Sequence, residues 1–135
     1  MAAKRENFHP DELNVRRVGG VPVYSHVVSV EGSRQIFIAG QLGRDAAGNV
    51  VGQGDMRRQL EQVHENLKIG LTAAGAALAD VVQTVTYTTD IEAFFACVDV
   101  RMQYYGDSLP TSTTVEVRRL AHPDLMVEVS AIAVV

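Results

Sequence analysis

The chain has 135 residues, of which 47% are hydrophobic and 21% are charged, and its formal net charge is −4. This size and composition predict one globular domain over residues 1–135 and exclude wholesale disorder. No run approaches the ~20 apolar residues of a membrane span, and the polar N-terminus lacks the apolar core of a signal peptide. A single cysteine, Cys97, excludes an internal disulfide, so we expect a cytoplasmic protein. The acidic balance, with no basic block, argues against a nucleic-acid surface.

The N-terminal third favours short strands. Residues 2–14 are polar and predict a loose lead-in, followed by a short edge strand at residues 15–18 that ends at Gly19 and Gly20. Residues 23–30 and 35–40 are rich in β-branched and aromatic side chains and are joined by turn-forming residues. Together they predict a β-hairpin.

Two helices are predicted by apolar residues spaced three and four apart. In the first, Asp55 is the expected N-cap and Gly75 the expected C-cap. Its apolar stripe consists of Met56, Leu60, Val63, Leu67, Leu71 and Ala74. The second follows a strand at residues 81–88, begins at a capping box formed by Thr89 and Glu92, and runs to Tyr105.

The C-terminal part holds two more strands, at residues 113–117 and 125–135. The second is long and almost wholly apolar, which predicts the middle of a sheet. The order of elements indicates an α+β fold, with two helices packed on one face of a mixed sheet. Two helices leave the other face uncovered, so we expect the chain to self-associate through it.

Two carboxylates interrupt the C-terminal strands. Glu116 and Glu128 each lie among aliphatic neighbours, where a charge is costly unless it is paired, hydrogen-bonded or reached by water. This pattern is the strongest indication of a site. The alternative is a structural ion pair of Glu128 with Arg118 or Arg119.

Other motifs favour structural roles. The sequence Gly52-Gln53-Gly54 indicates a plain turn rather than a phosphate loop, because the rest of a nucleotide-binding fingerprint is missing. Glu61 and His64 have a spacing used in di-iron bundles, but the second copy of that motif is absent. The four histidines are scattered, so no metal site and no cofactor are expected. Cys97 is expected to be a packed or half-exposed thiol.

Several segments, in order, resemble the Rid family, also called YjgF/YER057c/UK114 or endoribonuclease L-PSP-like proteins. They are residues 36–41, 59–66, 73–76, 80–82, 110–117 and 127–133. The resemblance implies a chorismate-mutase-like α+β fold and a homotrimer whose sheets form a central barrel. It also implies clefts between subunits that bind small molecules.

The resemblance also implies site residues. Glu128 corresponds to the glutamate beside the attacking water, Tyr24 to a tyrosine at the cleft rim, and Gly40 to a glycine whose backbone approaches the ligand. Ser112 occupies the position of the arginine that binds the substrate carboxylate in deaminase members, and Thr114 replaces a small residue nearby. This chain therefore resembles a branch that lacks that arginine. A cation from a neighbouring subunit could replace the missing charge, and the candidate donors are Arg34, Arg44, Arg118 and Arg119.

Three functions remain open. The first is a deaminase-type hydrolase of imines or enamines, such as 2-aminoacrylate, with Glu128 activating water. The second is a non-catalytic trimer that binds a small carboxylate or carbonyl compound or regulates another protein, which Ser112 favours. The third, an endoribonuclease, requires a basic RNA groove and is opposed by the acidic composition. No membrane or nucleic-acid partner is expected.

Overall fold

A computed structural model describes residues 3–135 of the chain. Its centre is a four-stranded sheet in the order β5-β8-β6-β7. These strands are β5 (Gln35–Leu42), β8 (Val127–Val134), β6 (Val81–Thr88) and β7 (Thr111–Glu116). The pair β6 and β7 is parallel, whereas β8 is antiparallel to both of its neighbours. The structure confirms the predicted mixed sheet and the predicted place of the last strand in its middle.

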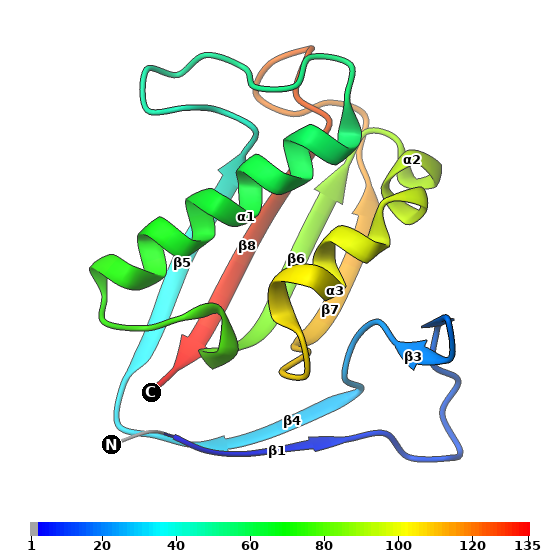
Figure 1. Cartoon of the computed structure of the whole chain (residues 1–135), viewed down its shortest axis with the longest axis vertical. Helices are drawn as coiled ribbons and strands as arrows, with labels where there is room; N and C mark the ends of the chain where they lie inside the picture. The colour runs from blue at the N-terminus through cyan, green and yellow to red at the C-terminus, as the bar shows by residue number, and fades with distance from the viewer. Residues whose placement is uncertain (1–2) are drawn as a thin grey trace.

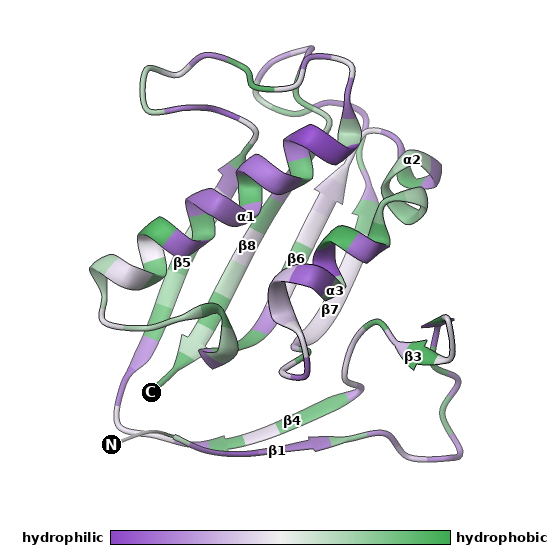
Figure 2. Ribbon diagram, viewed as in Figure 1, coloured by the Kyte–Doolittle hydropathy of each residue, from purple (hydrophilic) through white to green (hydrophobic). Residues whose placement is uncertain are grey.

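The helices cover one face of this sheet (Figure 1). They are α1 (Met56–Ala73), α2 (Ile91–Ala96) and α3 (Val98–Tyr105), and a short 3₁₀ turn, η1 (Leu78–Asp80), precedes β6. Helix α1 lies over β5 and β8, and its apolar side is turned toward the sheet (Figure 2). Its stripe residues Leu60, Val63, Leu67 and Leu71 are buried against the sheet. None of the helices among the described residues has the length and apolarity to cross a membrane.

The two ends of α1 form where the sequence places them. The Asp55 carboxylate accepts a hydrogen bond from the Arg58 amide, as an N-cap does. At the other end, the Ala76 and Gly75 amides donate to the carbonyls of Leu71 and Thr72. This is a Schellman motif, and Gly75 adopts the positive φ of 77° that it requires.

The second predicted helix is two helices in the structure. The chain changes direction at Cys97, which ends α2 and begins α3. Both helices bury residues of the one apolar stripe that predicted the helix, Phe94 in α2 and Val98 and Tyr105 in α3, so the spacing alone could not reveal a change of axis. The N-cap is Asp90, whose carboxylate accepts from the Ala93 amide, and not Thr89.

The N-terminal predictions are partly wrong. Residues 4–8 form a strand, β1 (Lys4–Phe8), instead of a loose lead-in; Ala2 lies outside the described residues. Strand β1 pairs with β4 (Val27–Glu31), while β5 pairs with β8, so the predicted hairpin does not form. The β1-β4 ribbon lies across one end of the sheet (Figure 1). The Arg5 guanidinium holds it there through hydrogen bonds to the carbonyls of Ala79 and Val81, at 2.9 and 2.8 Å. Such long-range bonds cannot be read from local composition.

The short strand predicted at residues 15–18 is confirmed over its last two residues. Strand β2 (Arg17–Val18) pairs with β3 (Val21–Pro22) across a two-residue turn. Gly19 and Gly20 both have positive φ, as a type I′ turn requires.

The second face of the sheet carries exposed apolar side chains. Phe37 of β5 is 68% exposed, and Tyr87 of β6 and Val115 of β7 are also exposed. Strand β8 shows why the faces differ: its buried residues alternate with half-buried ones, so neighbouring side chains point to opposite faces. Self-association through this face stays a prediction.

Candidate functional site

Glu128 lies on the open face of the sheet, next to Gly40. Its neighbours Val127 and Val129 are buried on the helix side, so the carboxylate points the opposite way. Strand β5 has an irregularity between Ile38 and Gln41, and Gly40 lies in it. A Cβ atom on Gly40 would lie only 2.6 Å from Oε2 of Glu128. The absence of a side chain at residue 40 therefore makes room for the carboxylate.

The Glu128 carboxylate is half-buried and has no partner of its own among the described residues, neither a hydrogen-bond donor nor a cation. The alternative of an ion pair with Arg118 or Arg119 is therefore wrong within one chain. Tyr87 lies directly opposite Glu128 in the β6-β8 register, so their side chains adjoin on the open face. A carboxylate free in this way can accept a proton or hydrogen bonds from a ligand or from water.

Glu116 has a different place. It is exposed, and its carboxylate accepts a hydrogen bond from the amide of Ile91, at 3.1 Å. Ile91 is the first residue of α2. Glu116 thus satisfies a free amide at a helix N-terminus, where negative charge is favourable. Of the two carboxylates that the strand pattern singled out, this one has a structural explanation.

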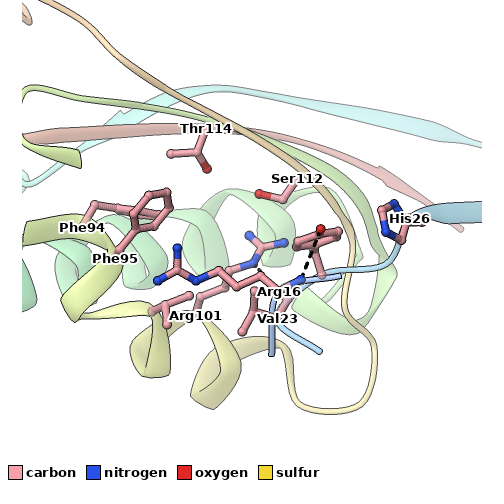
Figure 3. A pocket seen from close by; sticks show the side chains of 10 residues that line it. Arg16, Val23, His26, Phe94, Phe95, Arg101, Ser112 and Thr114 are labelled. Atoms are coloured by element: carbon pink, nitrogen blue, oxygen red, sulfur yellow. Dashed lines mark hydrogen bonds between the residues drawn. The ribbon is translucent and has the colours of Figure 1, made fainter. Parts of the chain in front are cut away.

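A cavity of about 450 Å³ brings together the other predicted residues, Tyr24, Ser112 and Thr114. It lies on the helix side of β7, against α2 and α3 (Figure 3). Ser112 and Thr114 align with the buried residues Thr84 and Thr86 of β6, which explains their direction. Glu128 and Gly40 do not line this cavity. One chain therefore does not unite the predicted site.

Two arginines that sequence reasoning missed also line the cavity, Arg16 and Arg101. Arg101 is only 5% exposed. Its guanidinium donates to the carbonyl of Val23 at 3.0 Å, to Oγ1 of Thr84 at 2.9 Å and to the carbonyl of Pro110 at 3.3 Å. Burial lowers the pKa of Arg101 from its usual range, but a guanidinium in a protein stays charged.

The sequence did contain a signal for Arg101. It is three residues after Val98 and four before Tyr105, so it occupies a position of the apolar stripe. A charged residue within such a stripe is unusual and indicates a special environment. Arg16 has no comparable signal, because it lies in an irregular segment. Its guanidinium stands 4.1 Å from the centre of the Phe95 ring.

Tyr24 is fixed at the edge of the cavity. Its hydroxyl accepts from the Arg16 amide and donates to the Asn14 carbonyl, both at 3.4 Å. Its ring meets that of His26 edge to face, with centres 5.2 Å apart. The apolar part of the wall comes from Val23, Phe94, Phe95 and Val98.

The proposed replacement cations are elsewhere in the chain. Arg34, Arg44, Arg118 and Arg119 do not line the cavity that contains Ser112. Arg118 and Arg119 border a separate hollow near His122, and Arg44 borders another beside Asn66. That one of these four serves Ser112 from a neighbouring subunit stays a prediction.

The remaining motifs have structural roles. His64 is buried in the core, donates Nδ1–H to the Leu60 carbonyl at 2.8 Å and stacks on Tyr104. Cys97 is half-buried and packs against the core, as predicted. The segment Gly52-Gln53-Gly54 is a turn before α1. Among residues 3–135, no His, Cys, Asp or Glu side chains gather as a metal site would need.

Known proteins resemble this chain over most of its length. Residues 17–135 match the family model described as Endoribonuclease L-PSP. A RutC family protein of Pyrococcus horikoshii is 36% identical over 83% of this chain and 88% of its own. A goat (Capra hircus) protein named 2-iminobutanoate/2-iminopropanoate deaminase is 36% identical over 82% of this chain and 79% of its own.

Solved structures agree. The Rid-family protein YyfB of Yersinia pestis has a TM-score of 0.83 at 32% identity, over 97% of this chain and 98% of its own. E. coli TdcF, solved with bound serine, has a TM-score of 0.68 at 28% identity, over 79% of this chain and 87% of its own. The α+β fold with its mixed sheet is therefore the fold of these proteins. The chain belongs to the Endoribonuclease L-PSP family, which is the Rid or YjgF/YER057c/UK114 family.

Proposed function

We propose that this Rid-family protein hydrolyses a small imine or enamine, with Glu128 activating water. The observation that carries the proposal is the half-buried Glu128 carboxylate beside Gly40, which has no ion-pair partner within residues 3–135. Relatives at 35–36% identity named 2-iminobutanoate/2-iminopropanoate deaminase support this class of reaction. The products would be a carbonyl compound and ammonia.

The chemistry requires one proton acceptor. Glu128 takes a proton from water as the water oxygen bonds to the imine carbon, and the π electrons of the C=N bond move to nitrogen. Glu128 gives this proton to nitrogen, which yields a carbinolamine. Glu128 then takes the proton of the new hydroxyl group and passes it to nitrogen, as the C–N bond breaks, the C=O bond forms and ammonia leaves. Glu128 ends the cycle as the carboxylate it was. A carboxylate without a competing cation is suited to this role, because an ion pair would weaken it as a base.

The proposal includes a homotrimer. Glu128 lies on the open face of the sheet, whereas the cavity with Tyr24, Ser112 and Thr114 lies on the helix side. A neighbouring subunit that brings its own Glu128 and Gly40 to the cavity edge at β7 would complete the site. The exposed Phe37 and Tyr87 support burial of the open face against other copies. Sedimentation equilibrium tests this part, and a monomer at micromolar concentration would contradict it.

Hydrolysis is tested with imines made in place by an amino-acid oxidase or a dehydratase, by following keto-acid release. We expect the wild type to accelerate release and Glu128→Gln to lose roughly 100-fold of that rate, a typical contribution of a general base. Glu116→Gln is the matched control, because the Glu116 carboxylate accepts a hydrogen bond from the helix amide of Ile91 and lies away from the cavity lining that the structure describes. Equal rates in the wild type and in a folded Glu128→Gln protein would remove Glu128 from the mechanism.

A second function is favoured by Ser112. A neutral hydroxyl offers one hydrogen bond where the resemblance places a guanidinium, which suits a trimer that binds a ligand without converting it. Saturable binding of a small carboxylate, with no turnover of any imine tested, would support this function. The endoribonuclease function stays the least favoured, and degradation of RNA that weakens with rising salt and is lost with Glu128→Gln would be needed to revive it.

A further inference from the structure

We infer that Arg101 and Arg16 form an anion-binding subsite in the cavity below β7, which holds the carboxylate of a ligand whose body is flat and apolar. The inference rests on the proposed function and narrows its substrates to 2-imino acids with large apolar or aromatic side chains. The charge would come from α3 and from the segment before β2.

The first support is the unbalanced charge of Arg101. All its described partners are neutral: the carbonyls of Val23 and Pro110 and the hydroxyl of Thr84. Within residues 3–135, no carboxylate forms an ion pair with it. A guanidinium has five N–H groups, and these three bonds leave one on each terminal nitrogen. A buried cation without an anion is costly, so a bound carboxylate would stabilise it.

The second support is the character of the cavity. Its lining contains two arginines and no acidic side chain among the described residues. Figure 3 shows Arg16 and Arg101 on the same side of the cavity, facing the strand that carries Ser112 and Thr114. A low-dielectric hollow with cations and no anions attracts negatively charged ligands.

The position of Arg101 relative to Ser112 follows from the sheet register. Thr84, which accepts a hydrogen bond from Nη1 of Arg101, lies directly beside Ser112 on the neighbouring strand. Both side chains point to the helix side, and adjacent strands lie about 4.8 Å apart. An anion that accepts from the Ser112 hydroxyl would therefore also be near the guanidinium.

Arg16 is held by an aromatic contact. Its guanidinium lies 4.1 Å from the Phe95 ring centre, and its amide donates to the Tyr24 hydroxyl. Stacking on the ring leaves the edge of the guanidinium free to bind a carboxylate. Arg16 is exposed and lines the cavity, so its guanidinium can be reached from solvent.

The side chains that line the cavity indicate which class of ligand it binds. Phe94, Phe95, Val98 and Val23 give an apolar interior, and about 450 Å³ is more room than a three- or four-carbon imino acid fills. Cavities of this size hold ligands with a ring or a branched chain. A planar carboxylate with such a body matches both the charge and the shape.

The experiment compares benzoate with its neutral isostere benzamide on the full-length protein, by calorimetry or chemical-shift titration. We expect benzoate to bind at least about tenfold more tightly than benzamide. In Arg16→Gln, benzoate affinity should fall about tenfold. The control is Arg17→Gln, because the Arg17 guanidinium only donates to the nearby Gly20 carbonyl and should leave the affinity unchanged.

Removing Arg101 would also remove three internal hydrogen bonds and risks unfolding the protein. Ser112→Asp avoids this, because it places a carboxylate beside Arg101 and should abolish benzoate binding while the protein stays folded. Equal affinity for benzoate and benzamide in the wild type overturns the inference. So does unchanged benzoate affinity in either Arg16→Gln or a folded Ser112→Asp.

The imine assay separates failure of the inference from failure of the proposed function. Imines made from phenylalanine and from alanine by an amino-acid oxidase are compared. Hydrolysis without preference for the aromatic imine and without dependence on Arg16 would leave the function standing and remove the subsite. Selective benzoate binding without hydrolysis of either imine would leave the subsite standing and remove the function.

Discussion

The side chain of Glu128 occupies the space that a Cβ atom would fill at Gly40. The three atoms nearest to such a Cβ are Oε2, Cδ and Cγ of Glu128, at 2.6 to 2.9 Å. These atoms belong to the flexible end of a half-buried side chain, so they can move aside at little cost. Gly40 therefore determines the position of the Glu128 carboxylate and has less influence on the stability of the fold.

Gly40→Ala should accordingly displace the Glu128 carboxylate while changing the free energy of unfolding by less than about 1 kcal/mol. Urea unfolding and the imine assay, measured on the same preparation, check this. Any stability loss should disappear when Glu128→Ala is added, because the shorter side chain removes the clash. A Gly40→Ala protein that keeps full hydrolytic activity would contradict the proposed placement of the base.

Leu67→Ala should destabilise the protein by about 2–5 kcal/mol, because Leu67 is wholly buried between α1 and the sheet and truncation leaves a cavity. Ile69→Ala on the same helix is the control. Ile69 is 68% exposed, so its truncation should change stability by no more than about 0.5 kcal/mol. Chemical denaturation of both variants provides the measurement. Similar losses would mean that the exposed face of α1 is buried in an assembly.

Asp55→Ala should cost about 1 kcal/mol, because the Arg58 amide loses its acceptor at the start of α1. Asp55→Ser keeps an acceptor and should recover most of the loss. Thermal unfolding at several salt concentrations compares the two. If both variants are equally destabilised, the charge of Asp55 matters more than its hydrogen bond.

The buried His64 should make the protein less stable in mild acid. Burial lowers the pKa of His64 from 6.5 to about 4, against the opposing effect of its hydrogen bond to Leu60. Because the pKa of His64 is lower in the folded protein than in the unfolded chain, the unfolded chain binds a proton at His64 that the folded protein does not bind. The free energy of unfolding should therefore decrease as pH drops from about 6.5 to about 4, by about 3 kcal/mol in total.

Urea unfolding at a series of pH values tests this, with His64→Phe as the comparison. The variant should lose the slope in that window, since a phenyl ring carries no proton. The ion pair of Arg57 with Asp99 lowers the pKa of Asp99 below 3.8, so its effect falls at lower pH and does not interfere. An unchanged slope in His64→Phe would assign the pH dependence to another group.

The sequence predicted best where one physical cause dominates. The stripe from Met56 to Leu71 reflects one buried helix face, and the almost wholly apolar run of β8 is typical of a strand in the middle of a sheet, so helix α1 and the central strand could be placed from pattern alone. The hairpin failed because composition does not specify a partner: β4 and β5 are adjacent in the chain but pair with β1 and β8.

The candidate site could be predicted only in pieces. Tyr24, Ser112 and Thr114 do meet in one cavity, but no sequence rule reveals that Arg101 reaches it from a helix whose stripe it shares with Val98. The lining of the cavity comes from α2, α3, β7 and the N-terminal segment, and the hydrogen bonds of Arg101 to Val23, Thr84 and Pro110 exist only after folding. The sequence could show that Arg101 places a charge at a buried position, but it could not show where the guanidinium points.

The strand order has a consequence for synthesis. Strands β5 and β6 each pair with β8 and not with each other, so the four-stranded sheet cannot form until β8 has been synthesised. On the ribosome, β5 must therefore wait until residues 43–126 and then β8 have emerged, with the apolar side of α1 unprotected. Long-range closure of this kind slows folding and leaves nascent chains prone to aggregate. Ribosome-bound chains halted before Val127 should recruit chaperones, and chains extended well past Val134 should release them.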